Sequence, residues 1–171
     1  MQQRGFTLIE LIIVIVILGI LAVTAAPKFI DVQSDAQGAT LKSVKAALTT
    51  GAQLVYAKSA LVGEQKTAYA GDATSQVSVN GVDVYTDFGY PASAGIDSDN
   101  AKLAAFVDLD LTNDWYLSTP SSSNSTSAGT FVLTPGTTKP TNTSTNTCKV
   151  TYTDAANENT PPTVVATITG C

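Results

Sequence analysis

Histidine is absent from this chain of 171 residues, and cysteine occurs only twice. Without histidine there is no Ser-His-Asp or Cys-His catalytic site, and the commonest zinc ligand is missing. Only scattered carboxylates remain for chemistry. A membrane-anchored enzyme is therefore the disfavoured alternative, and we expect no catalytic activity, no cofactor and no metal site.

Positive charge is also scarce. The chain has 9 Lys and Arg residues against 14 Asp and Glu residues, which gives a formal net charge of -5. An acidic surface repels the nucleic-acid backbone, so we expect no nucleic-acid partner.

The apolar residues are concentrated near the N-terminus. Residues 6–26 form a run of 21 in which only Thr7, Glu10 and Thr24 are clearly polar. At about 1.5 Å per residue, a helix of this length spans roughly 31 Å, close to the thickness of a bilayer core. A secretory signal cleaved after residues 24–26 and a plain membrane anchor both leave Glu10 unexplained, because an acid within a membrane span costs a few kcal/mol.

A third interpretation accounts for Glu10. Cleavage between Gly5 and Phe6 keeps the whole apolar helix and creates an α-amino group at Phe6, one helical turn from Glu10. The carboxylate and the ammonium can neutralise each other, within one chain or between staggered neighbours. Glu10 then sets the register of packed helices, where a purely apolar seam would slide.

The stretch RGFTLIE, residues 4–10, followed by the apolar run resembles the class III leader and N-terminal helix of type IV pilins and the related pseudopilins. The resemblance implies removal of leader residues 1–5 and N-methylation of Phe6 by a prepilin peptidase. It implies a subunit pool in the inner membrane and extraction into a helical homo-oligomeric filament. The implied partners are an assembly ATPase, a platform protein and an outer-membrane secretin.

Gly19 and Pro27 mark the part of this helix that is easiest to stretch. Pro27 offers no N–H to the carbonyl of Val23, and Gly19 weakens the helix by about 1 kcal/mol relative to Ala. The resemblance implies the same loosening in filaments. The alternative is that both are ordinary features of membrane helices, where Gly and Pro are frequent.

The rest of the chain divides into an amphipathic helix over 28–62 and a β-rich head over 63–171. Apolar residues recur at helical spacing from Leu41 to Val62, and Gly63 ends the helix. In the head, Asn80-Gly81 between alternating valines predicts a hairpin. We expect a short helix within 97–110, capped by Ser98 or Asp99, and strands at 130–134, 148–154 and 163–170. The predicted fold class is α+β, the type IV pilin fold, with residues 6–27 as its hydrophobic helix.

Cys148 and Cys171 indicate a disulfide in an exported chain, and the alternative is two buried free thiols. If 148–154 and 163–170 pair antiparallel, Cys148 lies opposite Cys171 and Tyr152 lies opposite Thr167. Cys171 then shares a face with the threonines and not with Ile168, so a bulge or another register is needed. The resemblance implies a disulfide-bounded segment at 148–171, which major pseudopilins usually lack.

Four features of the head have competing interpretations. The tract 118–147 holds 17 Ser or Thr in 30 residues and predicts a surface loop, with glycan attachment or an adhesive surface as the alternative. Asp97 to Asn100 opens like a calcium loop, but Lys102 stands where that loop needs Gly, which favours a turn and helix cap.

We favour core packing for Trp115 and Tyr116 over sugar stacking. We favour a solvated edge for Asp108 and Asp110.

Three segments narrow the resemblance to the mannose-sensitive haemagglutinin (MSHA) pilins of marine Gram-negative bacteria: APKFIDVQSDA (26–36), VYAKSALVGEQ (55–65) and VNGVDVYTDFGYPAS (79–93). The resemblance implies the major subunit of an extracellular pilus, or fimbrium, that serves cell adhesion, haemagglutination and biofilm formation. The alternatives are a type II secretion pseudopilin, a minor pilin and a DNA-uptake pilin.

Overall fold

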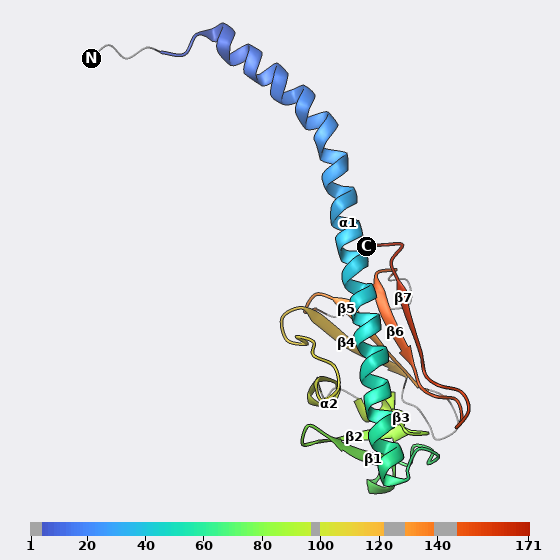
Figure 1. The fold of residues 1–171 in the computed structure, drawn as a ribbon. Coiled ribbons are helices and arrows are strands. Elements are labelled where there is room, and N and C mark those ends of the chain that lie inside the picture. The colour runs from blue at the N-terminus through green and yellow to red at the C-terminus, as the bar shows by residue number, and fades with distance from the viewer. Residues whose placement is uncertain (1–4, 97–99, 122–128, 139–146) are drawn as a thin grey trace. The chain divides into compact units, whose positions relative to one another are not determined.

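The computed structural model describes residues 5–96, 100–121, 129–138 and 147–171. The chain forms two units, Met1–Gln37 and Gly38–Cys171. The first unit holds the N-terminal part of a long helix. The second unit, which we call the head, holds the rest of that helix and all the strands (Figure 1).

The helix α1 runs from Leu8 to Val62 and is continuous through Gly19 and Pro27. It ends where Gly63 adopts a φ of +85°, a left-handed conformation that glycine takes without steric strain. Within the head, one face of α1 is buried and the opposite face is exposed. The buried face consists of Leu41, Val44, Leu48, Ala52 and Val55.

Gly51 lies on the same buried face and is required for close packing. A Cβ at this position would overlap the backbone carbonyl oxygen of Phe106 and would press on the side chains of Phe106 and Val107. Backbone cannot move aside as a flexible side chain can. We therefore expect Gly51 to be the point of closest approach between α1 and the segment that follows the short helix α2 (Asn100–Ala104).

Replacing Gly51 by Ala is therefore expected to destabilise the head, although Ala is the better helix former. The overlap requires a backbone shift, and such overpacking costs about 1–3 kcal/mol. Thermal unfolding of the full chain in detergent, followed by circular dichroism, measures the loss. Ala57→Ser on the exposed face of α1 is the control, and an unchanged melting temperature for Gly51→Ala would contradict the close approach.

Two antiparallel sheets make up the rest of the head. The smaller sheet has the order β1 (Gln76–Val79), β2 (Val82–Asp87) and β3 (Tyr90–Pro91). The larger has the order β4 (Trp115–Ser121), β5 (Thr130–Pro135), β6 (Lys149–Thr153) and β7 (Thr163–Thr167). Two short 3-10 turns, Ala73–Ser75 and Ser93–Ile96, precede β1 and α2.

The turn between β1 and β2 follows from its two central residues. Asn80 and Gly81 have φ values of 51° and 81°, so both are left-handed, as a two-residue hairpin turn of type I′ requires. The strands pair in register from Val79↔Val82 to Gln76↔Tyr85. Val77, Val79 and Val84 are buried, which places one face of the hairpin against the core.

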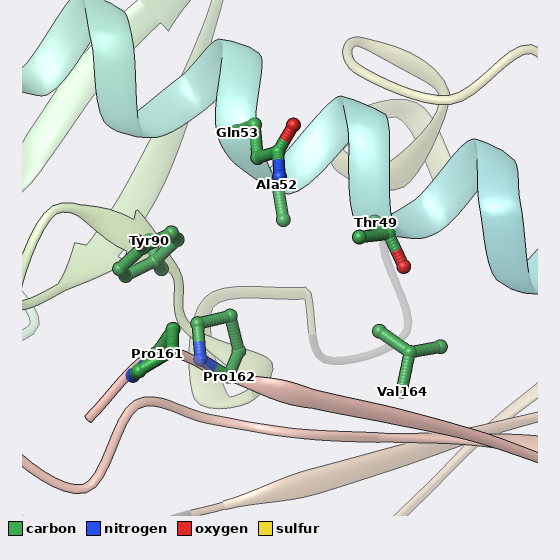
Figure 2. Close-up of a pocket in the computed structure, with 7 residues that line it drawn as sticks. All are labelled: Thr49, Ala52, Gln53, Tyr90, Pro161, Pro162 and Val164. Atoms are coloured by element: carbon green, nitrogen blue, oxygen red, sulfur yellow. The ribbon is translucent and has the colours of Figure 1, made fainter.

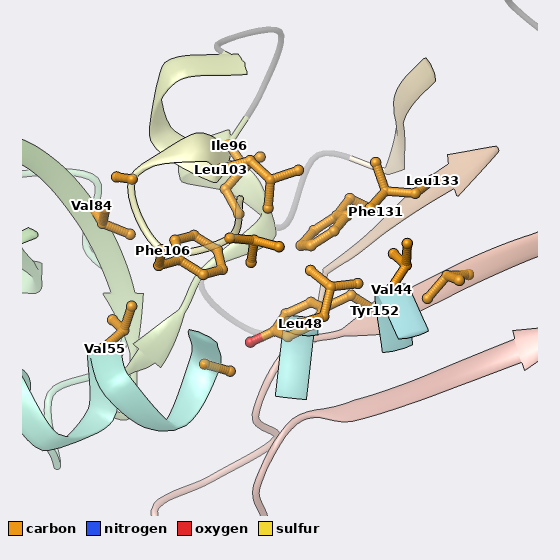
Figure 3. Close-up of a cluster of buried hydrophobic side chains, with 14 of the residues drawn as sticks. Val44, Leu48, Val55, Val84, Ile96, Leu103, Phe106, Phe131, Leu133 and Tyr152 are labelled. Carbon is orange, nitrogen blue, oxygen red and sulfur yellow. The ribbon is translucent and has the colours of Figure 1, made fainter. Parts of the chain in front are cut away.

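One hydrophobic core joins α1 to both sheets. In Figure 3, Val44 and Leu48 of α1 lie with Phe131 of β5 and Tyr152 of β6, whose rings stack with centroids 4.7 Å apart. Ile96, Leu103 and Phe106 complete the same cluster from the segment between the sheets. The long apolar helix, the antiparallel sheets and a C-terminal disulfide confirm the predicted α+β pilin fold.

Three local expectations need correction or restriction. The helix predicted within 97–110 is the five-residue α2, and both candidate caps, Ser98 and Asp99, lie outside the described residues. Trp115 is buried, as expected, but it begins a strand and does not follow a helix directly. The tract 118–147 is not a loop throughout, because residues 118–121 belong to β4 and residues 130–135 form β5.

The register expected between the last two strands is wrong. Tyr152 pairs with Val164, and Lys149 with Thr167. The strand β7 ends at Thr167 because the chain then turns: the Cys171 N–H donates to the Ile168 carbonyl at 3.3 Å. This turn, and no bulge, carries Cys171 back to Cys148, with which it forms a disulfide across a Cα–Cα distance of 4.8 Å.

Candidate functional site

The N-terminal part of α1 presents its apolar side chains to the outside all round. The window Leu8–Ala25 has a mean hydropathy of 3.0, and none of it is buried within the described residues. Phe6 is 82% exposed and Leu8 73% exposed. Length and composition suit a membrane span, and an exposed apolar surface of this size requires lipid or other helices as its surroundings.

The start of α1 is fixed by a reciprocal pair of polar residues. The Thr7 backbone N–H and hydroxyl donate to Oε2 of Glu10 at 2.9 and 2.7 Å, and the Glu10 N–H donates to the Thr7 hydroxyl at 3.3 Å. This is a capping box, in which two otherwise unsatisfied N–H groups of the first turn find partners. The signal T-x-x-E is present in the sequence, but the interpretation of Glu10 as a partner of the Phe6 amine does not use it.

The capping box also places the Glu10 carboxylate beside the predicted cleavage bond. Its oxygen lies 2.9 Å from the nitrogen of Thr7, the residue that directly follows Phe6. Gly5, Phe6 and Thr7 precede the helix and are exposed, and no neighbouring atom lies within 4 Å of a Cβ placed on Gly5. The Gly5–Phe6 bond thus lies in exposed chain outside the helix, where a peptidase could reach it, while Arg4 lies outside the described residues.

The segment between Gly19 and Pro27 contains a third weakening feature. The Thr24 hydroxyl donates to the carbonyls of Ile20 and Leu21 at 3.1–3.3 Å. Such side-chain bonds compete with the backbone ladder and often bend a helix. Gly19 has open space where a side chain would be. In the single chain α1 remains helical here, and the greater flexibility of this segment stays a prediction.

Inside the head, Asp154 is a buried acid that the sequence analysis misses. Its carboxylate accepts hydrogen bonds from the Ser93 N–H (2.9 Å), the Ser93 hydroxyl (2.8 Å) and the Gly129 N–H (3.1 Å). Burial raises the pKa of Asp154 to about 6 against the effect of these donors, and the negative charge of Asp87 adds to the rise. Asp154 thus joins the end of β6 to the turn at Ser93.

The raised pKa of Asp154 predicts that this residue makes the head less stable as pH rises from about 4 to 6. In that window the folded chain holds a proton that the unfolded chain, with an ordinary aspartate pKa of about 3.9, has released. The loss amounts to about 3 kcal/mol at most. Asp154→Asn removes this effect, so the variant should gain stability relative to the wild type between pH 4 and pH 7.

Melting temperatures of both chains across that pH range test the prediction. The exposed Asp108→Asn is the matched control, since it makes the same chemical change at the surface. A difference between wild type and Asp154→Asn that stays constant from pH 4 to pH 7 would rule out titration of Asp154.

The remaining candidate sites offer little chemistry. A pocket of about 70 Å³ lies between Thr49, Ala52 and Gln53 of α1 and the residues Tyr90, Pro161, Pro162 and Val164 (Figure 2). The seven residues that line it carry no charge. Asp110 accepts the N–H groups of Thr112 and Asn113 and so closes a turn. Within the described residues no three His, Cys, Asp or Glu side chains gather as metal ligands, and the calcium-like start at 97–99 lies outside them.

Known proteins match the chain at its N-terminal end. The family model for the prokaryotic N-terminal methylation motif matches residues 1–26. Over 48 residues the chain is 50% identical to the type IV narrow pilus major component PilA5 of Thermus thermophilus. That alignment covers 28% of this chain and 41% of the relative, so the chain spans less than half the length of the protein it matches. No solved structure matches it significantly.

The chain thus combines a methylation motif at residues 1–26, which includes the exposed apolar part of α1, with a disulfide-closed α+β head, and prepilins share this combination. Over 48 residues the chain is similar to a type IV pilus component, and its long apolar helix, antiparallel sheets and C-terminal disulfide fit the type IV pilin fold. These similarities cover the N-terminal segment and the general fold. They do not select the MSHA group.

Proposed function

We propose that the chain is the major structural subunit of a type IV pilus of the MSHA type. The observation that carries this proposal is the wholly exposed apolar helix Leu8–Ala25, which directly follows an open Gly5–Phe6 bond and contains one carboxylate, at Glu10. In a soluble protein this helix would expose its apolar surface to water, which is unfavourable. A filament core made of such helices buries all of it.

The proposed mechanism is assembly controlled by charge pairing. Cleavage after Gly5 turns the Phe6 nitrogen into an ammonium, which is then methylated. In the filament core, the Glu10 carboxylate meets the Phe6 amine of a neighbouring subunit. Every other register would leave a charge buried without a partner, and breaking a buried ion pair costs about 3–5 kcal/mol.

The stretchable segment between Gly19 and Pro27 has a role in the same mechanism. A subunit leaving the bilayer must fit its helix among others that cross at fixed positions. Where the helix is weakest, at Gly19, Thr24 and Pro27, it can lengthen without disturbing the register that Glu10 sets. We therefore place the adjustable part of the subunit between the pairing site and the head.

The implied partners are further copies of the chain, a prepilin peptidase, an assembly ATPase with its platform protein, and a secretin. The subunit pool lies in the inner membrane of a Gram-negative bacterium, and the filament is extracellular. The MSHA assignment rests on the segments 26–36, 55–65 and 79–93, and carries attachment, haemagglutination and biofilm formation with it. The disulfide Cys148–Cys171 favours a pilin over the pseudopilin alternative.

Intact-mass analysis of filaments sheared from the cell surface tests the proposal. The expected dominant species begins at Phe6, carries one added methyl group and is two hydrogens lighter for the disulfide. Additional mass would report glycans on the head. A chain cleaved at Phe6 but absent from sheared filaments would support a pseudopilin or a minor pilin, and cleavage near Ala26 would refute the assembly mechanism.

A further inference from the structure

β7 is an edge strand of the four-stranded sheet, and no other described strand pairs with its outer side. It pairs with β6 alone, and Thr163–Thr167 make no other backbone hydrogen bond with the described residues. Natural sheets shield their edges with Lys, Pro or bulges. The opposite edge, β4, has such devices, Pro120 and a register shift between Ser118 and Ser121. The strand β7 has neither a charge nor a proline.

The register identifies which backbone groups of β7 point outward. Just beyond β6, the Asp154 N–H donates to the Gly129 carbonyl at 2.9 Å, and these two residues continue the register of the β5–β6 pair. The backbone groups of Asp154 therefore face β5. Backbone groups alternate along a strand, so those of Lys149, Thr151 and Thr153 face β7. Their partners Thr167, Val165 and Thr163 face back. The N–H and C=O groups of Val164 and Ala166 therefore point away from the sheet.

The sequence of β7, TVVAT, is nearly palindromic, and we propose that β7 pairs antiparallel with β7 of a second copy of this chain. With Val165 opposite the partner's Val165, Val164 lies opposite Ala166 and Thr163 opposite Thr167. Val164 and Ala166 are the residues with outward backbone groups, so each such pair exchanges both of its hydrogen bonds. The two-fold symmetry makes the Val164–Ala166 pair occur twice, and no charged residues lie opposite each other.

The side chains fit this register. Val165 is 54% exposed and pairs with Thr151 of β6. It lies on the outer face of the sheet, whereas Val164 and Ala166 face the core. At the centre of the new contact the two Val165 residues form a non-hydrogen-bonded pair, where Cα atoms are only about 4.5 Å apart and side chains are closest. Each valine covers the other, and threonine pairs flank them, a favourable cross-strand combination.

β7 is also held ready for pairing. Pro161 and Pro162 precede it, and after it the disulfide ties Cys171 to Cys148 beside the start of β6. Both constraints are already present in the single chain. An edge that is ordered before binding loses less conformational entropy when it binds, which strengthens the association.

The contact has a consequence that rests on the proposed function. A two-fold contact uses the same surface on both copies. All subunits of one pilus point the same way, so we assign the β7–β7 contact to subunits of two different filaments. The expected result is side-by-side association of pili.

Val165→Cys tests the pairing directly in cells carrying the full chain. A Cys at the two-fold centre faces its own copy at disulfide distance, so sheared filaments should give a reducible dimer on a gel. Thr163→Cys is the matched control on the same strand and face. In the proposed register it lies about 13 Å along the strand from its own copy, out of disulfide reach. We expect about tenfold more dimer for Val165→Cys.

Val165→Lys gives a second readout, because it places like charges opposite each other at the centre of the contact. Filament bundles in electron micrographs should separate into single pili, while Val62→Lys, an equally charged change at an exposed site on α1, should leave bundles intact. The pairing would be overturned if filaments of cleaved subunits gave equal amounts of dimer in both cysteine variants, or if Val165→Lys left the bundles intact. Absence of filaments in the wild type would instead refute the proposed function.

Discussion

Cells that carry Glu10→Val should cleave and methylate the subunit but display almost no pili. The mature variant has an ammonium at Phe6 with no carboxylate to meet it inside an apolar bundle. An unpaired buried charge costs about 3–5 kcal/mol per subunit, which corresponds to at least a hundredfold loss in the equilibrium constant of each addition step. The measurement compares pilin in the sheared fraction with pilin in the membrane, and we expect it to accumulate in the membrane.

Thr7→Ala is the control that separates the two roles of Glu10. It removes the two hydrogen bonds of the Thr7 hydroxyl but leaves the carboxylate in place for a neighbour's amine. An N-cap contributes about 1 kcal/mol to the helix, so pili should persist in this variant. Equal loss of pili in Thr7→Ala and Glu10→Val would show that helix capping, and not charge pairing between subunits, is what assembly needs.

The sequence was informative wherever a few neighbouring residues decide the structure. Asn80-Gly81 predicts its hairpin because the turn requires two left-handed residues, and Gly63 marks the end of α1 for a related reason. The buried face of α1 from Leu41 to Val55 follows from helical spacing, but Leu61 and Val62, which continue the same spacing, are 87% and 63% exposed. Each of these signals lies within a window of one or two turns, so no distant contact was needed to interpret it.

The errors arise where distant segments decide. The register of β6 and β7 depends on a turn after Thr167 that is stabilised by a bond from Gly170 to Thr147, and the alternation of residues does not reveal such a turn. β4 was missed because Ser118 to Ser121 continue a polar tract, although the strand pairs with β5. Asp154 was missed because its donors, Ser93 and Gly129, are far away in the sequence.

At the candidate site the sequence supplied the residues but not all of their contacts. Gly5, Phe6 and Glu10 stand out because an acid inside an apolar run demands an explanation. The second function of Glu10, in the capping box with Thr7, follows from the local pattern T-x-x-E. The interpretation of Glu10 as a charge partner does not use that pattern. The open edge of β7 was not visible in the sequence at all, because it exists only once the order of the four strands is known.

Replacing Cys148 and Cys171 together by Ala should have the largest effect on stability. The bond closes a loop between residues 23 apart, which restricts the unfolded chain and contributes on the order of 3 kcal/mol. For a chain of this size the melting temperature should fall by about 6–12 °C. Loss of the disulfide also releases the end of β7. There the Ile168 side chain lies against Gly38 of α1, 3.8 Å from the point that a Cβ on Gly38 would occupy.

Wild-type protein under reducing conditions is the control for this pair of substitutions, since both lack the bond and differ only in two small side chains. Their melting temperatures should agree within a few degrees and lie well below that of the oxidised wild type. The release of β7 gives a second and more local signal: amide hydrogen exchange should accelerate in Thr163–Thr167 more than in β5, because among the described strands β7 pairs only with β6. Uniform acceleration across the sheet would show that the disulfide stabilises the head as a whole and not its edge in particular.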